Sequence, residues 1–510
     1  MCWGCTPTTQ RVWSFGLGAV FLAFAITLGV LWPSISTDLI NKELSLVEYS
    51  TNYKNWIKSP FSLYMEFYLF NWTNWEEFHV PNENGEFRSD IKPKFEELGP
   101  YVFEEIHERV GIVYDDDGNE IAFNQTKTWW FREDLSNGTL DDQITSINPV
   151  ALTTAYFTRY LPDTLKGIID ALLMQLSKMF ITASVKEWIF DGFDEGILEW
   201  IQDLIESGEL PPGLPIPEIP YDKFGWFALR NGSAEYDKRF EMFTGKDDIK
   251  KLGILKSWDG KTELGVMSGE CDKIKGTTGE LWPPFNRNKK EDAVMFIPDV
   301  CRSLTLKYEK ESKIQGIKGW KWIGDESMFD NGEKYPENKC YCQAETEEEC
   351  SAIKSGIFNA SACQYGAPSF ASFPHFYLAD ESYLEAVEGL SPDKEKHEMY
   401  ITLEPEIGLP LEIRARLQIN LFLRNDPMLS FYKNVPDVYI PMFWFTQIAD
   451  LPKDLADEAK MIYVVQGIGL WIAYGMFAIS IFCLIMGVIF VFYYKKSPIP
   501  DKRPATVERA

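Results

Sequence analysis

The chain has 510 residues, of which 45% are hydrophobic, and it carries a formal net charge of −26 at pH 7. This length exceeds the usual domain size of about 100–150 residues, so we expect one or two large domains with a sizeable core. A chain this acidic repels nucleic acid at long range, which excludes nucleic-acid binding as its function.

The first predicted element is an apolar stretch near the N-terminus. Residues 12–32 contain no Asp, Glu, Lys, Arg or His, and about 20 apolar residues suffice for a helix to cross a membrane. A cleaved signal peptide is the alternative, because a single basic residue, Arg11, precedes the stretch. We favour a membrane span, since "LWPSIST" offers no small-x-small cleavage site and the apolar run is too long for a signal peptide.

Strand patterns come next, followed by helical ones. "SLYMEFYLFNWT" at residues 62–73 alternates and is rich in aromatic residues, and "PYVFEEI" at residues 100–106 is a second strand candidate. Residues 161–180 have apolar side chains at helical spacing. "SVKE" at residues 184–187 has the form of a capping box that opens a second helix, and a third is predicted near residues 194–207. This order predicts an α+β domain, with a helical bundle at residues 150–208 inserted in a β-rich body.

Cysteines cluster after this bundle. An even number within 93 residues of one loop predicts three disulfides, with 15 possible pairings, in an oxidising compartment. The six cysteines of this disulfide-rich region, residues 271–363, are Cys271, Cys301, Cys340, Cys342, Cys350 and Cys363.

Two further strands are predicted near the end of the loop. "EKHEMYITLEP" at residues 395–405 is a short candidate. In "LPLEIRARLQINLFL", residues 409–423, every odd position is apolar, while charged and amide side chains alternate with them from Glu412 to Asn420. A period of two over this length predicts a strand with one dry face and one wet face.

The second uncharged stretch, residues 461–494, is longer than one bilayer crossing and predicts a second span with a juxtamembrane part. The tail that follows, residues 495–510, has a net charge of +3, which predicts a cytoplasmic location. Residues 1–11 are then cytoplasmic too, and residues 33–460 lie outside the cell with a net charge of −30.

N-glycosylation sequons agree with this topology. The outer loop holds five N-x-S/T sequons and neither tail holds one. The predicted glycosylation sites are Asn71, Asn124, Asn137, Asn231 and Asn359.

Catalysis and ion conduction receive little support. The four histidines have no metal-ligand spacing, and neither a G-x-S-x-G elbow nor a phosphate-binding glycine loop is present. We therefore predict a binding protein that needs no cofactor and no metal.

Ion channels and membrane-bound ectonucleotidases share the arrangement of two spans around a cysteine-bearing loop. For a pore, however, the second span offers chiefly Gln466, Ser480 and four glycines, and we interpret those glycines as sites of close helix packing.

Six blocks of the sequence closely resemble the class B scavenger receptors, the family of the fatty acid translocases, and the resemblance is greatest to its insect members. The resemblance spans both membrane segments and nearly the whole outer loop, and the blocks occur in the same order as in the family. They are "FNWTN" (70–74), "ELGPYVFEE" (97–105), "SNGTLDD" (136–142), "GTTGELWPPF" (276–285), "FASFPHFYLAD" (370–380) and "VPDVYIPMFWF" (435–445).

The resemblance implies a distorted antiparallel β-barrel, topped by a helical bundle and crossed by an apolar tunnel that leads toward the membrane. The dry face of residues 409–423 would then look into the barrel, where some side chains fill the core and others line the tunnel. The tunnel-lining candidates are Leu411, Ile413, Leu417, Ile419 and Leu421.

The resemblance also implies ligand binding at the apex of the helical bundle. The apical candidates are Arg159, Lys166, Lys178 and Lys186, in a segment that is basic relative to its surroundings. Family members that bind oxidised lipoprotein carry a lysine pair here, and only Lys178 matches it. Affinity for anionic oxidised lipid is therefore not implied.

Matching the outer cysteines to the family in order implies the disulfides Cys271–Cys340, Cys301–Cys363 and Cys342–Cys350. S-acylation near the first span is usual in the family, which implies acylation of Cys2 and Cys5. The second span offers only Cys483, so acylation beside the C-terminal tail is unsupported.

Three functions are consistent with these features. The first is a plasma-membrane scavenger receptor that binds lipoprotein particles or apoptotic cells and admits lipid through the barrel. The second is a facilitator of fatty acid, sterol or carotenoid uptake. The third is a lysosomal or chemosensory relative that acts in sorting or ligand delivery; the tail shows no dileucine or clear tyrosine-based signal for the lysosome. Phospholipids are further candidate ligands, and a homo-oligomer is compatible with all three.

Overall fold

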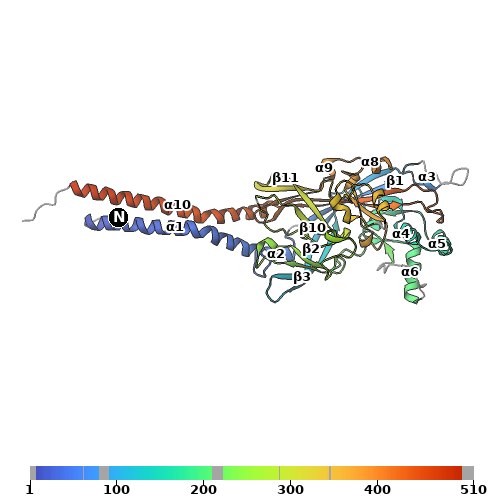
Figure 1. The fold of residues 1–510 in the computed structure, drawn as a ribbon, viewed down its shortest axis with the longest axis horizontal. Helices are drawn as coiled ribbons and strands as arrows, with labels where there is room; N and C mark the ends of the chain where they lie inside the picture. Colours follow the sequence, from blue (N-terminus) through green and yellow to red (C-terminus); the bar gives the residue numbers. More distant parts are fainter. Residues whose placement is uncertain are drawn as a thin grey trace, which may run out of the picture. The chain divides into compact units, whose positions relative to one another are not determined.

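The computed structural model describes residues 7–60, 62–79, 91–208, 222–286, 288–343 and 346–496. The chain forms two compact units (Figure 1). We call the unit that holds the first and last helices the helix-pair unit, and the remainder, Leu44–Pro452, the sheet unit.

The helix-pair unit contains α1 (Pro7–Leu44) and α10 (Lys453–Lys496). Each helix includes an apolar stretch long enough to cross a membrane, as predicted. Both helices extend beyond the predicted stretches. α1 continues past Pro33, whose carbonyl oxygen accepts hydrogen bonds from the hydroxyls of Ser36 (3.2 Å) and Thr37 (2.8 Å).

Glycines bring α1 and α10 close together. A Cβ atom at Gly469 would lie 2.1 Å from the ring of Trp32, and one at Gly487 would lie 3.0 Å from another aromatic ring of α1. The packing interpretation is therefore correct for these two glycines. It is wrong for Gly475, where an added Cβ atom would meet no described atom within 4 Å beyond the adjacent turns of α10, and for Gly467, where the nearest side chain, that of Trp471, belongs to α10 itself.

The sheet unit alternates long strands with short helices. Its strands are β1 (Leu63–Trp72), β2 (Phe95–Tyr114), β3 (Glu120–Phe131), β4 (Gln143–Ile147), β5 (Phe180–Ser184), β6 (Phe193–Asp194), β7 (Lys223–Phe224), β8 (Phe240–Phe243), β9 (Leu255–Trp258), β10 (Ala293–Ile297), β11 (Arg302–Ile314), β12 (Ile317–Ile323), β13 (Ile357–Asn359), β14 (Ser369–Ser372), β15 (Tyr400–Glu404), β16 (Leu409–Leu423) and β17 (Val438–Asp450). Its α-helices are α2 (Thr51–Ile57), α3 (Trp75–His79), α4 (Pro149–Thr158), α5 (Asp163–Leu176), α6 (Gly196–Ser207), α7 (Glu347–Ala352), α8 (Glu381–Glu385) and α9 (Lys394–His397). Shorter turns are η1 (Glu187–Asp191), η2 (Ile249–Lys251), η3 (Gly269–Cys271), η4 (Pro298–Val300), η5 (Pro336–Tyr341), η6 (Ser361–Cys363) and η7 (Pro374–Phe376).

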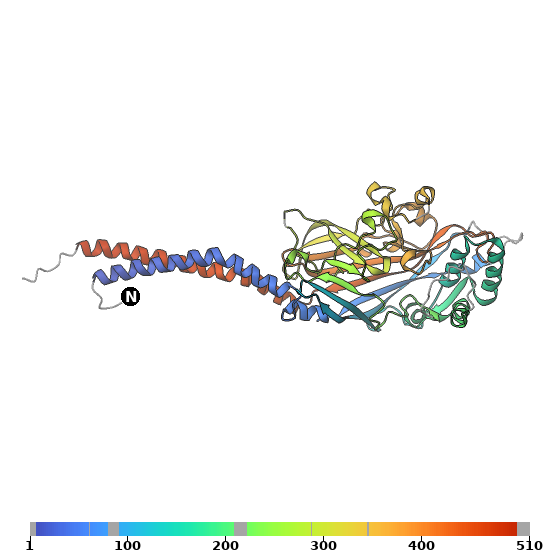
Figure 2. The same cartoon turned by 60° about the horizontal axis from the view of Figure 1, so that its bottom comes forward.

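Thirteen of the described strands form one antiparallel sheet in the order β10-β11-β12-β15-β16-β17-β1-β2-β3-β8-β9, with β13 and β14 attached beside β16. The first strand, β1, lies next to the last, β17, as the blue and red-orange arrows in Figure 2 show. In register, Phe445 of β17 pairs with Phe67 of β1 and with Leu417 of β16.

A short segment joins the two ends of this sheet. The backbone N–H of Leu255 in β9 donates to the carbonyl of Gly276 (2.8 Å), and the N–H of Phe296 in β10 donates to the carbonyl of Thr277 (2.8 Å). The sheet therefore curls until its end strands meet at residues 276–277. The expected distorted barrel takes the form of an open strand path that is bridged at this point.

The helical predictions hold in part. The predicted helix at 161–180 ends at Leu176, and Met179 and Phe180 belong to the turn and to β5, where Phe180 pairs with Ile147. Ser184 and Glu187 form the reciprocal bonds of a capping box, but the predicted helix is only the five-residue turn η1. The third helix, α6, ends at Gly208 as predicted.

The strand at residues 409–423 is β16, with the predicted bounds, but its polar face is not uniformly wet. Gln418 and Asn420 are fully buried. The Gln418 side chain accepts a hydrogen bond from the N–H of His375 (2.7 Å), and the Asn420 amide donates to the hydroxyl of Ser372 (3.0 Å). These amides are buried because β14 pairs with this half of the strand and η7 packs against it.

Candidate functional site

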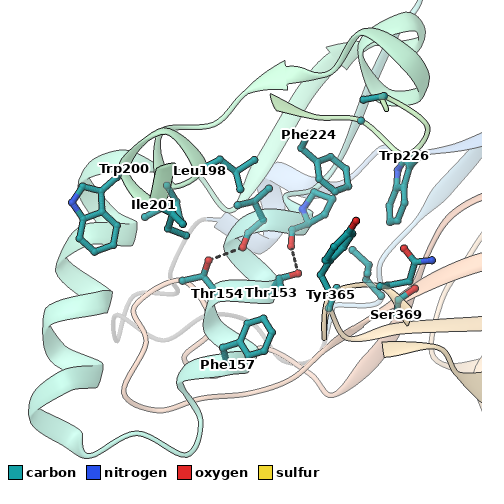
Figure 3. A pocket seen from close by; sticks show the side chains of 18 of the residues that line it. Thr153, Thr154, Phe157, Leu198, Trp200, Ile201, Phe224, Trp226, Tyr365 and Ser369 are labelled. Carbon is teal, nitrogen blue, oxygen red and sulfur yellow. Dashed lines mark hydrogen bonds between the residues drawn. The ribbon is translucent and has the colours of Figure 1, made fainter. Parts of the chain in front are cut away.

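A cavity of about 150 Å³ lies at the end of the sheet unit that carries α4, α5 and α6, which we call the apical helices. Its wall comes from these helices, from residues 224–229 and 364–369, and from the end of β16 (Figure 3). Its apolar members include Phe157, Leu198, Trp200, Phe224, Trp226 and Leu421. This apical cavity is the candidate binding site.

One buried junction positions the apical helices around the cavity. Asn148 caps α4, because its side-chain oxygen accepts from the N–H groups of Val150 (3.0 Å) and Ala151 (3.3 Å). Its amide nitrogen donates to the carboxylate of Glu195 (3.0 Å), which caps α6 by accepting from the N–H of Ile197 (2.8 Å). The hydroxyl of Ser177, at the end of α5, also contacts Glu195. We call Asn148, Ser177 and Glu195 the helix junction.

Polar groups in the middle of the cavity wall are satisfied by the backbone. The hydroxyl of Thr153 donates to the carbonyl of Pro149 (2.6 Å), and that of Thr154 donates to the carbonyl of Val150 (2.9 Å), as the dashed lines in Figure 3 show. Because these bonds lie within α4, the hydroxyl hydrogens of Thr153 and Thr154 are not free to bind a ligand, and most of the other described lining residues are apolar. The cavity therefore suits an apolar ligand.

The predicted tunnel-lining residues occupy different positions. Leu421 lines the apical cavity. Leu411 and Leu417 are 1% and 3% exposed, respectively, so both are packed in the core. Ile413 and Ile419 are half-buried on the face of β16 that carries Leu417. The role of these five residues in a tunnel remains a prediction.

The predicted apical cations do not form one cluster. Arg159 and Lys166 line a second hollow of about 320 Å³. The guanidinium of Arg159 stacks 3.6 Å from the ring centroid of Tyr156, and Lys166 pairs with Asp426 (3.6 Å).

The other two apical cations lie on other elements. Lys186 pairs with Asp141 (3.2 Å), an interaction that raises the pKa of the lysine. Lys178 is exposed, and no ion pair joins it to any other described residue. Of the four cations, Lys178 is therefore the most accessible to an anionic ligand.

A buried polar cluster inside the sheet was missed by sequence reasoning. Glu105 and His107 alternate with outward residues along β2 and contact one another. Trp129 and Gln447 donate to the two oxygens of Glu105, each over 2.9 Å. Burial alone would raise the pKa of Glu105, but His107, Lys127 and Trp129 outweigh it and lower that pKa to about 2. Within the described residues, no group of three or more His, Cys, Asp or Glu side chains could hold a metal ion.

The disulfides are Cys271–Cys340, Cys301–Cys363 and Cys342–Cys350, the pairing that the family resemblance implies. Cys2 and Cys5, the predicted acylation sites, lie outside the described residues.

The predicted glycosylation sites differ in accessibility. Asn137 and Asn231 are exposed, whereas Asn71, Asn124 and Asn359 are half-buried. Asn71 accepts a hydrogen bond from the N–H of Thr145 (2.9 Å). The occupancy of all five sites remains a prediction.

Comparison with known proteins decides the family. The sequence model of the CD36 family matches residues 16–491 of this chain. This chain belongs to the CD36 family. The assignment confirms the resemblance to the class B scavenger receptors.

Several named members of the CD36 family match most of the chain. Protein peste of Drosophila melanogaster is 34% identical over 459 residues, which cover 89% of this chain and 78% of the relative. Sensory neuron membrane protein 2 of Ostrinia furnacalis is 30% identical over 495 residues, which cover 94% and 92%. Scavenger receptor class B member 1 of Mus musculus is 28% identical over 435 residues, which cover 84% and 79%.

CD36-family membership and the two terminal apolar helices together make the chain a two-span membrane protein with a large extracellular domain, the sheet unit. The scavenger receptors of the CD36 family are receptors rather than enzymes.

Proposed function

We propose that this protein is a cell-surface class B scavenger receptor that binds lipid-bearing particles or apoptotic cells at its apical helices and passes lipid to the membrane through the interior of the sheet. The observation that carries the proposal is the apolar apical cavity in a chain of the CD36 family. The mouse relative, named a scavenger receptor, supports the same role.

An apolar route lowers the barrier to lipid movement. Each CH₂ group moved from an apolar site into water costs about 0.8 kcal/mol. A cavity of about 150 Å³ is the size that binds a benzene-like molecule, so the apical cavity holds one part of a lipid. The rest of a longer chain would continue along the inner face of the sheet.

The inner face next to the cavity is compatible with such a route. Ile413, Ile419 and Phe445 are only half-buried, although they share a face with buried Leu417 and Phe67. This partial exposure supports accessible space beside β16 and β17. The lipid would then run down its own gradient without an ATP site.

The charge of the C-terminal tail favours one orientation of the chain in the membrane. The positive C-terminal tail supports cytoplasmic termini. Epitope tags at the two ends of the full chain should be detected only after cells are permeabilised.

Lys178 is the apical cation most open to ligand, so Lys178→Glu should weaken particle binding more than Lys166→Glu or Lys186→Glu. No loss of binding in Lys178→Glu would remove Lys178 from the binding site, and equal loss in the three variants would show that Lys178 contributes no more than the other two lysines.

Two other functions remain as alternatives. A facilitator of fatty acid, sterol or carotenoid uptake would use the same apical cavity, and particle binding would be incidental. A sorting or ligand-delivery protein is supported by similarity to sensory neuron membrane protein 2 over 94% of this chain.

One experiment separates these functions. The full chain is expressed in non-phagocytic cells, and binding of apoptotic cells is measured beside uptake of a labelled lipid. A scavenger receptor confers both activities, whereas an uptake facilitator confers only the second. If surface-expressed protein confers neither, the proposed function is wrong and the delivery role becomes the better explanation.

A further inference from the structure

The wall of the apical cavity is uncharged. Among its described lining residues there is no Lys, Arg, His, Asp or Glu. Buried Arg230, which follows the lining residue Leu229 in the chain, is already paired, because it binds Asp237 (3.0 Å) and both oxygens of Asp299 (2.8 and 3.0 Å). Burial raises the pKa of Tyr236, which also lines the cavity, so its hydroxyl stays neutral. The cavity therefore supplies no counter-ion.

Polar groups gather at one end of the same cavity. Ser369, Tyr365 and Gln364 belong to the lining, and Figure 3 shows Ser369 and Tyr365 on the side of Trp226, away from Trp200. Ser369 is 1% exposed, and its hydroxyl has no hydrogen-bond partner among the described residues. A buried hydroxyl without a partner is unfavourable, and a ligand oxygen would satisfy it.

We infer that the apical cavity selects uncharged lipids that carry a hydroxyl or carbonyl oxygen, such as long-chain alcohols, aldehydes and esters, over ionised fatty acids. The inference rests on the proposed function, since it specifies the cargo of that cavity. Ser369 is the group that would hydrogen-bond the ligand oxygen.

The preference follows from desolvation. An alcohol or ester oxygen that enters the cavity exchanges hydrogen bonds with water for one with a protein hydroxyl. A carboxylate must lose its hydration without a cation to replace it, which disfavours the ionised form far more strongly. A fatty acid should therefore enter mainly as the protonated acid, which is a minor species at neutral pH because a carboxyl group has a pKa of about 4.3.

The test compares two photoreactive ligands of equal chain length, a fatty alcohol and a fatty acid, on the full-length protein in detergent. Labelled peptides that contain cavity residues report binding at this site, and competition with unlabelled ligand gives the affinity. We expect the alcohol to bind at least tenfold more tightly than the acid at pH 8. Between pH 8 and pH 6 the affinity for the acid should rise by up to about 100-fold while that for the alcohol stays constant, because the protonated fraction rises tenfold per pH unit.

Variants assign the preference to named residues. Ser369→Ala should weaken alcohol binding about 3- to 10-fold. The matched control is Ser355→Ala, which removes another fully buried hydroxyl without a partner among the described residues, but outside the cavity lining. Tyr365→Lys, at a lining residue that is 41% exposed and so tolerates a charge, should raise acid affinity at pH 8 at least tenfold. Tyr49→Lys, at an exposed residue outside the lining, serves as its control.

The outcomes separate this inference from the function on which it rests. Equal, pH-independent binding of alcohol and acid would overturn the inference and leave a lipid receptor intact. Alcohol labelling of the cavity that persists in Ala228→Trp, where a bulky ring fills a lining position, would also overturn it. Absence of any lipid labelling in folded protein would overturn both.

Discussion

Two buried histidines in the sheet unit accept hydrogen bonds from backbone groups. The rings of His375 and His397 stack with centroids 4.4 Å apart. The Nδ1 atom of His397 accepts from the N–H of Asp393 (2.9 Å), and that of His375 accepts from the N–H of Ser391 (3.0 Å). Since an accepting nitrogen carries no proton, protonation there would break a backbone hydrogen bond.

The pH dependence of stability follows from this pair. Burial, and then the neighbouring His375, lower the pKa of His397 to about 4. In the unfolded chain the pKa is about 6.5, so between these values the unfolded state binds a proton that the folded state does not. The free energy of unfolding should therefore fall as the pH is lowered, by about 2 kcal/mol between pH 7 and pH 5.

The measurement is the melting temperature of the full chain at both pH values, beside that of His397→Gln. We expect a smaller drop in the variant. Glu97, Asp393 and Arg416 also face His397 and are unchanged in it, so the difference isolates the histidine. Equal drops in the two proteins would rule out His397 as the source.

At the scale of elements, the helix junction ties the ends of three helices to one buried asparagine. Asn148→Ala removes the cap of α4 and leaves the buried carboxylate of Glu195 without one donor. We expect the free energy of unfolding to fall by about 2–3 kcal/mol and lipid labelling of the apical cavity to weaken. Thr346→Ala is the control, since Thr346 caps α7 outside the cavity through the N–H of Glu349 (3.1 Å). Thr346→Ala should lower the free energy of unfolding by about 1 kcal/mol and leave lipid labelling unchanged. Unchanged labelling in Asn148→Ala would show that the helix junction does not shape the apical cavity.

The glycines of α10 make a second prediction at this scale. Gly469→Leu would place a side chain where the ring of Trp32 lies, so α1 and α10 must separate. At Gly475 an added Cβ atom meets no described atom within 4 Å beyond the adjacent turns of α10, so Gly475→Leu is the control. In detergent, the thermal unfolding of the full chain should shift to lower temperature in Gly469→Leu and not in Gly475→Leu. Similar shifts in both would mean that the contact with Trp32 contributes nothing to stability.

Elements with strong local sequence patterns were predictable, but which distant segments bury them was not. Alternation over residues 409–423 gave the bounds of β16 because period two is a local property. The burial of Gln418 and Asn420 depends on β14, about fifty residues away in the chain, so the same alternation led to a wrong expectation of solvent. Met179 and Phe180 continued a helical spacing, but pairing with β4 placed Phe180 in a strand.

For the whole molecule, the uncharged stretches predicted the two spans and the family resemblance predicted the disulfide pairing, whereas the cavity was visible only in the structure. Its wall combines α4, α6, residues 364–369 and Leu421, which no local pattern connects. The inward Glu105 and His107 were equally hidden, because both faces of β2 contain charged residues and the sequence does not indicate which face turns inward.

The route through the sheet unit is the prediction that belongs to the whole molecule. Leu417 is 3% exposed, so a tryptophan there would disrupt packing as well as any passage. Ala415 lies two residues away on the same face and is half-buried, which makes Ala415→Trp the better obstruction. If lipid passes along this face, the variant should reduce labelled lipid uptake several-fold while binding of apoptotic cells is retained.

The control is Glu412→Trp, which places the same ring on the opposite face of β16 at another half-buried position. Surface expression and melting temperature verify folding of both variants. Because binding at the apical helices and passage along β16 use different parts of the sheet unit, Ala415→Trp should separate the two activities and Glu412→Trp should impair neither. Full uptake by a folded Ala415→Trp protein would mean that lipid does not travel along this strand.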